Sequence, residues 1–297
     1  MLEKTCGKTA LIMEETDMNI GLRLHDTLPG NLNERLAIAE GQGFTCAHLA
    51  MSKVIPGFKM DDAPSLLTAE LAREVRDQFA AHHMECAVLG CYLKLAALDG
   101  EERKKTQEIY RAHLRFGRMI GARVVGTETP ASAANHWDED ACHGEEALRL
   151  FIDSLRPVVQ WAEEEDAIIA VEPVISHIVH TPKRAEQVLD ALKSDHLQII
   201  LDAVNLFSMD HLDQADVIVE DAIRRLGDKV TVLHMKDYEP APGEKRPRAI
   251  ACGTGHMRYD ALLRFAKQKS LPMTLENTKP ENAQATREYL EKLAAAL

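Results

Sequence analysis

The feature of this chain that most constrains its fold is a regular alternation of short apolar runs with longer amphipathic segments. The amphipathic segments repeat apolar residues at helical spacing, as Leu67, Leu71, Val75 and Phe79 do. The short runs are rich in Val, Ile and Leu and fit buried strands. We place eight of them, at residues 19–25, 44–51, 85–93, 122–128, 167–174, 197–205, 230–237 and 271–277. Such alternation predicts a parallel sheet covered by helices.

The number and spacing of these units predict a closed barrel. Eight strand–helix units within 297 residues match a (β/α)8 TIM barrel, whose usual size is about 250 residues plus insertions. We therefore predict a single α/β domain over residues 1–297, in which residues 1–17 form an extension before the first strand. A doubly wound open sheet is built from the same units and stays the alternative. Helix starts are expected after Asn31, where Glu34 completes a capping box, and at Pro182.

The composition argues against several classes of protein. With a formal net charge of −12, the chain would repel a phosphate backbone, so we expect no nucleic-acid partner. No apolar run reaches the length of about 18 residues that a membrane-spanning helix needs, and the N-terminus shows no secretory signal. We therefore expect a cytoplasmic protein without a membrane partner. The six cysteines show no C-x-x-C spacing, which indicates neither a disulfide framework nor a thiolate zinc site.

The last four predicted strands end alike, each with a polar residue after an apolar run: Glu172 in AVEPV, Asp202 in ILDAVN, His234 in VLHMKD and Glu276 in TLEN. The carboxyl ends of TIM-barrel strands form the mouth where catalytic residues lie, so these side chains are expected to converge. Three carboxylates brought together would repel one another, and a divalent cation is the simplest way to hold them. Taken singly, each residue could instead cap a helix or serve as a hydrogen-bonded structural side chain.

The ligand set is mostly hard, with carboxylate oxygens and one imidazole. It favours Mn²⁺, with Mg²⁺, Co²⁺ or Zn²⁺ as alternatives. A divalent ion that chelates a carbonyl oxygen and a neighbouring hydroxyl acidifies the adjacent C–H by stabilising the enediolate that forms. One carboxylate can then remove the proton and a second can return it. The same intermediate can expel a β-hydroxyl, so the residue types leave isomerisation, epimerisation and dehydration open.

These strand ends resemble those of the sugar phosphate isomerase/epimerase family, whose members are xylose isomerase-like TIM barrels. The resemblance covers nearly the whole chain and rests on five motifs: EPV at 172–174, LDAVN at 201–205, LHMKD at 233–237, the G-x-G turn at 253–255 and LEN at 275–277. It implies a sugar isomerase or epimerase that acts on a small carbohydrate. It also implies a homo-oligomer, either a dimer or a tetramer.

The resemblance further implies roles for particular residues. One divalent metal would be held by Glu172, Asp202, His234 and Glu276, and the two glutamates would act as the acid/base pair. Ketose 3-epimerases of the family carry a His three residues after the Asp, where this chain has Asn205. This departure argues against a ketose 3-epimerase, although an Asn can still hydrogen-bond a sugar hydroxyl. A metal-dependent lyase, such as a keto-polyol dehydratase or a keto-glycoside-cleaving enzyme, is the runner-up, and a non-catalytic sugar-binding barrel is the third hypothesis.

Substrate contacts are expected from other polar side chains near the strand ends and in the loops that follow them. Without a role in substrate binding, these residues could instead form a salt bridge at the rim, be solvated in a loop or simply pack. Two arginines in the long segment 239–260 are candidates for binding an anionic group such as a phosphate or carboxylate. His113 falls on an apolar helical stripe and is predicted to pack in the core. The candidate substrate-binding residues are His48, Tyr92, Glu128, His177, Asn205, Lys236, Arg246 and Arg248.

Overall fold

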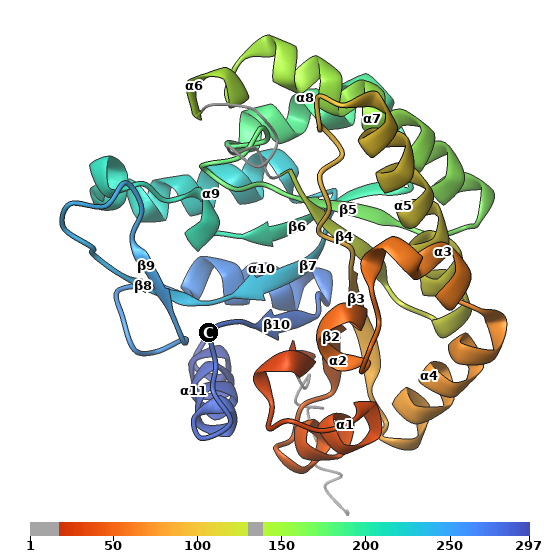
Figure 1. Ribbon diagram of the computed structural model, residues 1–297. Coiled ribbons are helices and arrows are strands. Elements are labelled where there is room, and N and C mark those ends of the chain that lie inside the picture. Colours follow the sequence, from red (N-terminus) through yellow and green to blue (C-terminus); the bar gives the residue numbers. More distant parts are fainter. Residues whose placement is uncertain (1–17, 130–138) are drawn as a thin grey trace, which may run out of the picture.

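Parallel strands pair edge to edge and close on themselves in the order β1-β10-β7-β6-β5-β4-β3-β2 (Figure 1). The computed structural model describes residues 18–129 and 139–297, so the predicted extension at 1–17 lies outside it. The closed barrel confirms the predicted fold, and the open doubly wound sheet is wrong. The strands are β1 (Ile20–Arg23), β2 (Cys46–Leu49), β3 (Glu85–Gly90), β4 (Val124–Glu128), β5 (Ile169–Glu172), β6 (Leu197–Asp202), β7 (Val230–Met235) and β10 (Met273–Leu275).

Each strand lies within its predicted run but is shorter than that run. The run at 197–205, for example, leaves the barrel after Asp202 and continues as the 3-10 turn η4 (Val204–Leu206). Val204 and Leu206, which lie beyond the strand, are buried as well. Inside the barrel, most strands contribute one or two apolar side chains to a single buried layer. The interior is therefore a packed core and not a pore. Its residues are Cys46, Ala87, Val88, Val124, Ala170, Ile200 and Val232.

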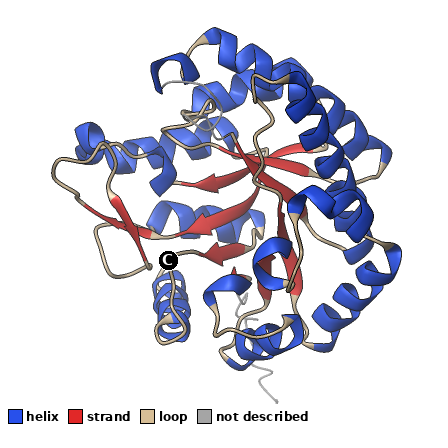
Figure 2. Cartoon of the chain, viewed as in Figure 1, coloured by secondary structure: helices blue, strands red, loops and turns tan. Residues whose placement is uncertain are grey.

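Helices form the outer ring around the strands, as Figure 2 shows in blue and red. The capping box at Asn31 is confirmed, because its side chain accepts from the Glu34 amide while Glu34 accepts from the Asn31 amide. Pro182 begins a helix, as predicted. Among the described residues, no helix is long and apolar enough to cross a membrane. The helices are α1 (Leu32–Gly41), α2 (Met51–Val54), α3 (Ala63–Leu66), α4 (Ala69–Ala81), α5 (Gly100–Ile120), α6 (Glu139–Cys142), α7 (Glu145–Glu164), α8 (Pro182–Leu192), α9 (Ala215–Leu226), α10 (Asp260–Lys269) and α11 (Ala283–Ala295), with 3-10 turns η1 (Leu24–Asp26), η2 (Met60–Asp62) and η5 (Met209–Gln214).

The long segment after β7 contains structure that the sequence did not predict. β8 (Asp237–Glu239) and β9 (Arg248–Ile250) form an antiparallel two-stranded hairpin that follows β7 directly (Figure 1). Each strand has only three residues, and the connection between them is rich in Pro and Gly, so no alternating pattern marks the hairpin. The hairpin matters for the site because its connection carries Arg246 to the barrel mouth.

Candidate metal and substrate site

The four polar strand ends converge at one side of the barrel. Glu172 ends β5, Asp202 ends β6, His234 lies near the end of β7, and Glu276 directly follows β10. Asp202 and His234 are register partners on neighbouring strands. All four side chains are buried, with Glu276 the most exposed at 8%. The expected juxtaposition is therefore present, and what these residues bind stays a prediction.

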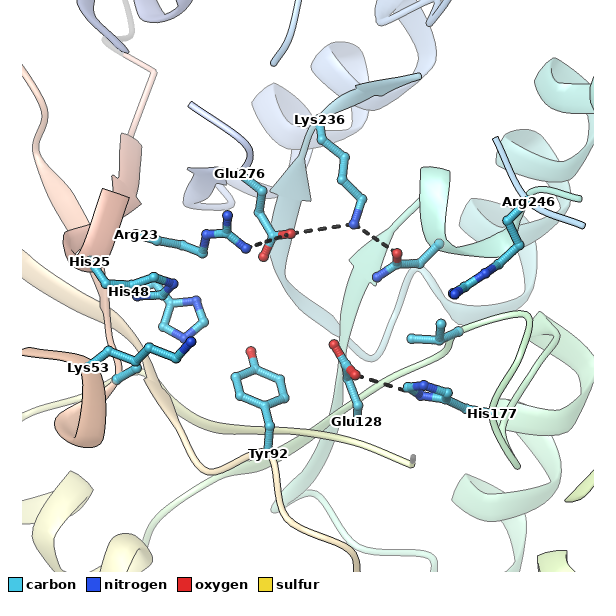
Figure 3. Close-up of a pocket in the computed structure, with 13 residues that line it drawn as sticks. Arg23, His25, His48, Lys53, Tyr92, Glu128, His177, Lys236, Arg246 and Glu276 are labelled. Carbon is cyan, nitrogen blue, oxygen red and sulfur yellow. Dashed lines mark hydrogen bonds and ion pairs between the residues drawn. The ribbon is translucent and has the colours of Figure 1, made fainter. Parts of the chain in front are cut away.

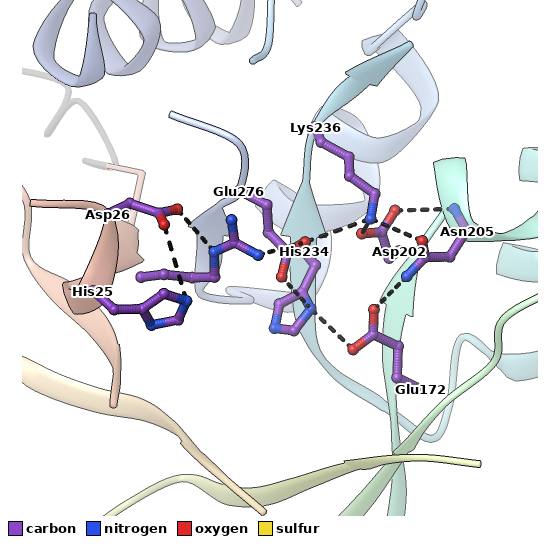
Figure 4. A network of polar contacts seen from close by, with 9 residues as sticks. His25, Asp26, Glu172, Asp202, Asn205, His234, Lys236 and Glu276 are labelled. Atoms are coloured by element: carbon purple, nitrogen blue, oxygen red, sulfur yellow. Dashed lines mark hydrogen bonds and ion pairs between the residues drawn. The ribbon is translucent and has the colours of Figure 1, made fainter. Parts of the chain in front are cut away.

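His234 lies between the two glutamates. Its Nδ1 is 3.1 Å from Glu172 Oε2 and 3.3 Å from Glu276 Oε1 (Figure 4). Burial alone would lower the pKa of His234, but the carboxylates of Glu172 and Glu276 raise it to about 9. For Glu276, burial would raise the pKa, but His234, Lys236 and Arg23 hold it well below its usual range. Without a metal, the imidazolium therefore neutralises part of the carboxylate cluster.

Lys236 supplies a second buried cation to the same cluster. Its Nζ lies 2.8 Å from Asp202 Oδ2 and 3.4 Å from Glu276 Oε2, and the side chain is 7% exposed. Burial would lower the pKa of Lys236, but Asp202 and Glu276 keep it above its ordinary value. Lys236 is therefore a counter-ion in the floor of the site, and its salt bridges lie there and not at the rim. Its contact with a substrate stays a prediction.

Asn205 ties these groups together through three hydrogen bonds. Its Nδ2 donates to Glu172 Oε1 at 2.7 Å, and its Oδ1 accepts from Lys236 Nζ at 2.8 Å. Its backbone amide donates to Asp202 Oδ1 at 3.2 Å. Only one orientation of the side-chain amide makes both hydrogen bonds, because its NH₂ must face the Glu172 carboxylate and its oxygen must face the Lys236 ammonium. Asn205 thus fixes the positions of the carboxylates in addition to lying at the pocket.

The cluster has the donor atoms that a divalent cation needs. Ligand atoms of Glu172, Asp202 and His234 lie within 4.8 Å of one another, and so do those of His48, His234 and Glu276. Among the described residues, no hydrogen bond is made by Nε2 of His234 or by either ring nitrogen of His48, although all three atoms are buried. A buried nitrogen without a partner is costly, and metal ligation would satisfy it. The residues therefore fit a divalent ion. His48, which was predicted from the sequence to contact the substrate, is also a candidate metal ligand.

A cavity of about 270 Å³ opens above this cluster at the barrel mouth (Figure 3). It gathers seven of the eight predicted substrate residues beside Glu276, namely His48, Tyr92, Glu128, His177, Asn205, Lys236 and Arg246. The structure does not bring Arg248 to the cavity. Arg248 lies on β9 with a side chain that is 71% exposed, and it pairs with Glu239 across the hairpin. The charge of Arg248 is therefore paired with a carboxylate outside the site.

Glu128 and His177 lie next to each other, on the side of the cavity opposite Glu276. His177 Nδ1 lies 3.7 Å from Glu128 Oε2. Burial, with the charges of Glu172 and Glu276, raises the pKa of Glu128 to about 8, and burial lowers the pKa of His177 to about 4. Both side chains are therefore neutral near pH 7, and the contact at 3.7 Å is not an ion pair. Glu128 then carries a proton that it can donate.

Three basic or imidazole side chains that line the cavity were not predicted from the sequence: Arg23, His25 and Lys53. Arg23 Nη1 lies 3.4 Å from Glu276 Oε2, and its Nε donates to Asp26 Oδ2 at 2.8 Å. A signal for the first two was present, because LRLH ends the first predicted strand with polar residues just as the later strands end. Lys53 lies on the four-residue helix α2 and has no comparable signal.

Residues 36–295 match the family described as xylose isomerase-like TIM barrel. A search of curated protein sequences finds no match. Solved structures are similar over most of the chain. A 3-keto-D-glucoside 4-epimerase from E. coli has 16% identity and a TM-score of 0.68, with 93% of this chain and 100% of that chain covered. The probable 3-DHS dehydratase from Bacillus anthracis that is involved in petrobactin synthesis has 14% identity and a TM-score of 0.68, with 94% and 99% covered. A xylose isomerase-like TIM barrel protein from Mycobacterium smegmatis in complex with magnesium has 14% identity and a TM-score of 0.67, with 94% and 97% covered. At these identities the likeness shows a shared fold.

Proposed function

This chain belongs to the xylose isomerase-like TIM barrel family, and we propose that it is a divalent-metal-dependent isomerase or epimerase. It would move a proton at a carbon next to a carbonyl in a sugar or a related polyol ketone. Structures that share the fold comprise an epimerase and a probable dehydratase, so the fold alone does not select one activity. The proposal rests on the residues of the site.

The observation that carries the proposal is the placement of two glutamates on either side of one buried imidazole. Glu172 and Glu276 approach His234 Nδ1 at 3.1 and 3.3 Å, and Glu276 also lines the cavity. Two carboxylates at one reacting centre can divide the work of removing and returning a proton. A sugar-binding barrel without catalysis would have no need to bury three carboxylates, which cost free energy unless they are compensated.

A bound divalent ion would polarise the substrate carbonyl and so acidify the neighbouring C–H. Glu172, Asp202 and His234 would hold it, with Glu276 or His48 completing the set. Glu276 is the candidate base, because it lines the cavity whereas Glu172 does not, and the surrounding cations keep it in the ionised form that can accept a proton. Lys236 and Asn205 hold the carboxylates in place. Glu172, on the far side of His234, would return the proton.

A lyase in the same site is favoured by one specific observation. Glu128 lies across the cavity next to His177, and its raised pKa leaves it protonated near neutral pH. A protonated carboxyl opposite the base can give its proton to a departing β-hydroxyl, which converts proton abstraction into dehydration. An unsaturated product that absorbs in the ultraviolet would identify this outcome.

The test is solvent-deuterium incorporation into ketoses, keto-inositols and 3-keto-sugars by the Mn²⁺-loaded protein. Glu276→Gln should lower the exchange rate by about 100-fold or more, because the amide cannot accept the proton. Glu164→Gln, at an exposed position on α7, is the matched control and should exchange like the wild type. Circular dichroism checks that both variants are folded. Exchange at the wild-type rate in folded Glu276→Gln would contradict the proposed role of this glutamate.

A further inference from the structure

One wall of the cavity is built from basic and imidazole side chains. Arg23 and His25 come from the end of β1 and the turn η1, His48 comes from β2, and Lys53 comes from α2. Figure 3 shows these four side chains on the same side of the cavity, with the Lys53 ammonium directed between His48 and Tyr92. We infer that this wall, called the cationic wall below, binds an anionic group of the substrate, either a carboxylate or a phosphate. This inference rests on the proposed function, because it names the substrate class of the same site.

The cationic wall holds donors that the protein itself does not use. His48 is 3% exposed, and neither of its ring nitrogens makes a hydrogen bond to the described residues, so that one nitrogen would still be able to donate to the anion if the other held the metal ion. His25 Nδ1 is likewise buried without a hydrogen-bond partner among them. Lys53 is exposed and, within the same part of the chain, has neither a hydrogen bond nor an ion pair, so its ammonium is free to bind a ligand. Native proteins rarely leave buried polar atoms unpaired, so a ligand with several acceptor oxygens is the expected partner.

Arg23 fixes the direction in which that ligand would be held. A guanidinium has five N–H donors in a rigid plane. Here Nε is bound to Asp26 at 2.8 Å and Nη1 approaches Glu276 at 3.4 Å, which orients the plane and leaves further donors. The side chain is 22% exposed, so it is largely shielded from water. A preoriented and partly desolvated guanidinium is well suited to bind carboxylate or phosphate oxygens.

The charge balance of the wall also favours an anion. Asp26 and Glu276 each contact Arg23, but Glu276 is shared with Lys236 and His234. Lys53 then adds a positive charge with no carboxylate opposite it. Burial lowers the pKa of His25 and of His48, so the positive charge of the wall comes from Arg23 and Lys53, in a chain whose formal net charge is −12. A neutral sugar would leave the Lys53 ammonium without a counter-charge.

The position of the wall favours a carboxylate close to the reacting carbon. Arg23 contacts Glu276, the proposed base, and the ligand atoms of His48 lie within 4.8 Å of those of Glu276 and His234. An anion held by Arg23 and Lys53 therefore lies beside the point of proton transfer. A carboxylate one or two carbons from the reacting carbon satisfies this geometry. A phosphate at the far end of a sugar chain would lie farther away.

The experiment compares the binding of three six-carbon probes to the Mn²⁺-loaded protein by calorimetry: D-gluconate, D-glucitol 6-phosphate and neutral D-glucitol. The wild type should bind at least one anionic probe about tenfold more tightly than glucitol, because charge-assisted hydrogen bonds exceed neutral ones. Tighter binding of gluconate identifies a carboxylate substrate, and tighter binding of the phosphate identifies a phosphorylated one. Lys53→Met should remove most of the anionic preference without changing glucitol binding.

Lys59→Met is the matched control, since Lys59 lies in the same loop region, is exposed and is not among the cavity residues. It should keep the wild-type preference. Arg23→Gln provides a second variant, which should also lose the preference. Equal binding of all three probes by the wild type would overturn the inference, as would an anionic preference that survives in Lys53→Met. Neither result depends on turnover, so the deuterium-exchange test of the proposed function stands separately.

Discussion

At the scale of single residues, Asp237 explains why the segment after β7 has its shape. Its Oδ1 accepts from the amides of Tyr238 and Met257 at 2.8 and 2.7 Å. Its Oδ2 accepts from the amides of Gly253 and Gly255 at 3.0 and 2.9 Å. One buried carboxylate thus closes the loop that begins at the hairpin. Glycine is required at 255, because a Cβ there would lie 2.2 Å from the Tyr238 carbonyl oxygen.

Asp237→Asn should therefore destabilise the protein strongly. The amide NH₂ cannot accept a hydrogen bond, so two of the four backbone donors would lose their acceptor and face another donor. We expect a loss of about 3 kcal/mol in the free energy of unfolding, measured by urea denaturation. Asp228→Asn is the control, because Asp228 is 97% exposed and should change stability by less than about 0.5 kcal/mol. Equal effects of the two variants would contradict this role of Asp237.

The same scale shows which site residues the sequence can reveal. Glu172, Asp202 and Glu276 stand out because a carboxylate is unexpected at the end of a buried apolar run. Lys236 could be placed near His234 by strand alternation, but its choice of partner depends on Asp202 and Asn205, which arrive from another strand. Sequence patterns carry no information about such contacts between strands, which are set by the barrel register.

At the scale of elements, the long helix α5 contains a histidine that is completely buried. His113 is 0% exposed, as predicted from its apolar stripe, and its Nδ1 lies 2.8 Å from the Ile109 carbonyl oxygen. Nε2 is buried without a hydrogen-bond partner among the described residues. Burial lowers the pKa of His113 to about 4, despite the opposing effect of that carbonyl. The helix therefore packs around a neutral imidazole.

This burial predicts a pH-dependent contribution to stability. Between the unfolded pKa of about 6.5 and the folded pKa of about 4, the unfolded chain binds more protons, so stability falls as the pH falls through that window. The loss should amount to about 3 kcal/mol by pH 4. The free energy of unfolding of His113→Leu, measured in urea between pH 7 and 4, should fall correspondingly less. His211→Gln, at an exposed position, should follow the wild type, and a His113→Leu profile parallel to the wild type would contradict the prediction.

The sequence predicted the elements that have a clear apolar pattern with marked ends, and it did not predict the very short strands. The eight barrel strands lie inside their predicted runs because β-branched residues and turn signals mark both ends. The β8–β9 hairpin has three residues in each strand and three prolines in the connection between them, so its pairing depends on Asp237 and the folded loop. The run at 197–205 was too long because Asn205 turns away from the ladder to reach Glu172.

At the scale of the whole molecule, barrel closure is what turns four separate strand ends into one site. The register between β6 and β7 sets Asp202 beside His234, and closure through β10 brings Glu276 to the other side of the same imidazole. The apolar layer is packed inside the barrel. His234 and Lys236 neutralise the carboxylates when no metal is bound. Oligomer formation and the cellular compartment stay predictions.

The central claim is that this cluster is a metal site centred on His234. The most direct measurement is metal content by plasma mass spectrometry after Mn²⁺ loading and desalting, for the wild type, His234→Ala and His211→Gln. The wild type and the exposed His211→Gln control should each retain about one ion per chain, whereas folded His234→Ala should retain little, because both candidate ligand sets include His234. Equal metal content in all three proteins, or none in any of them, would contradict the claim.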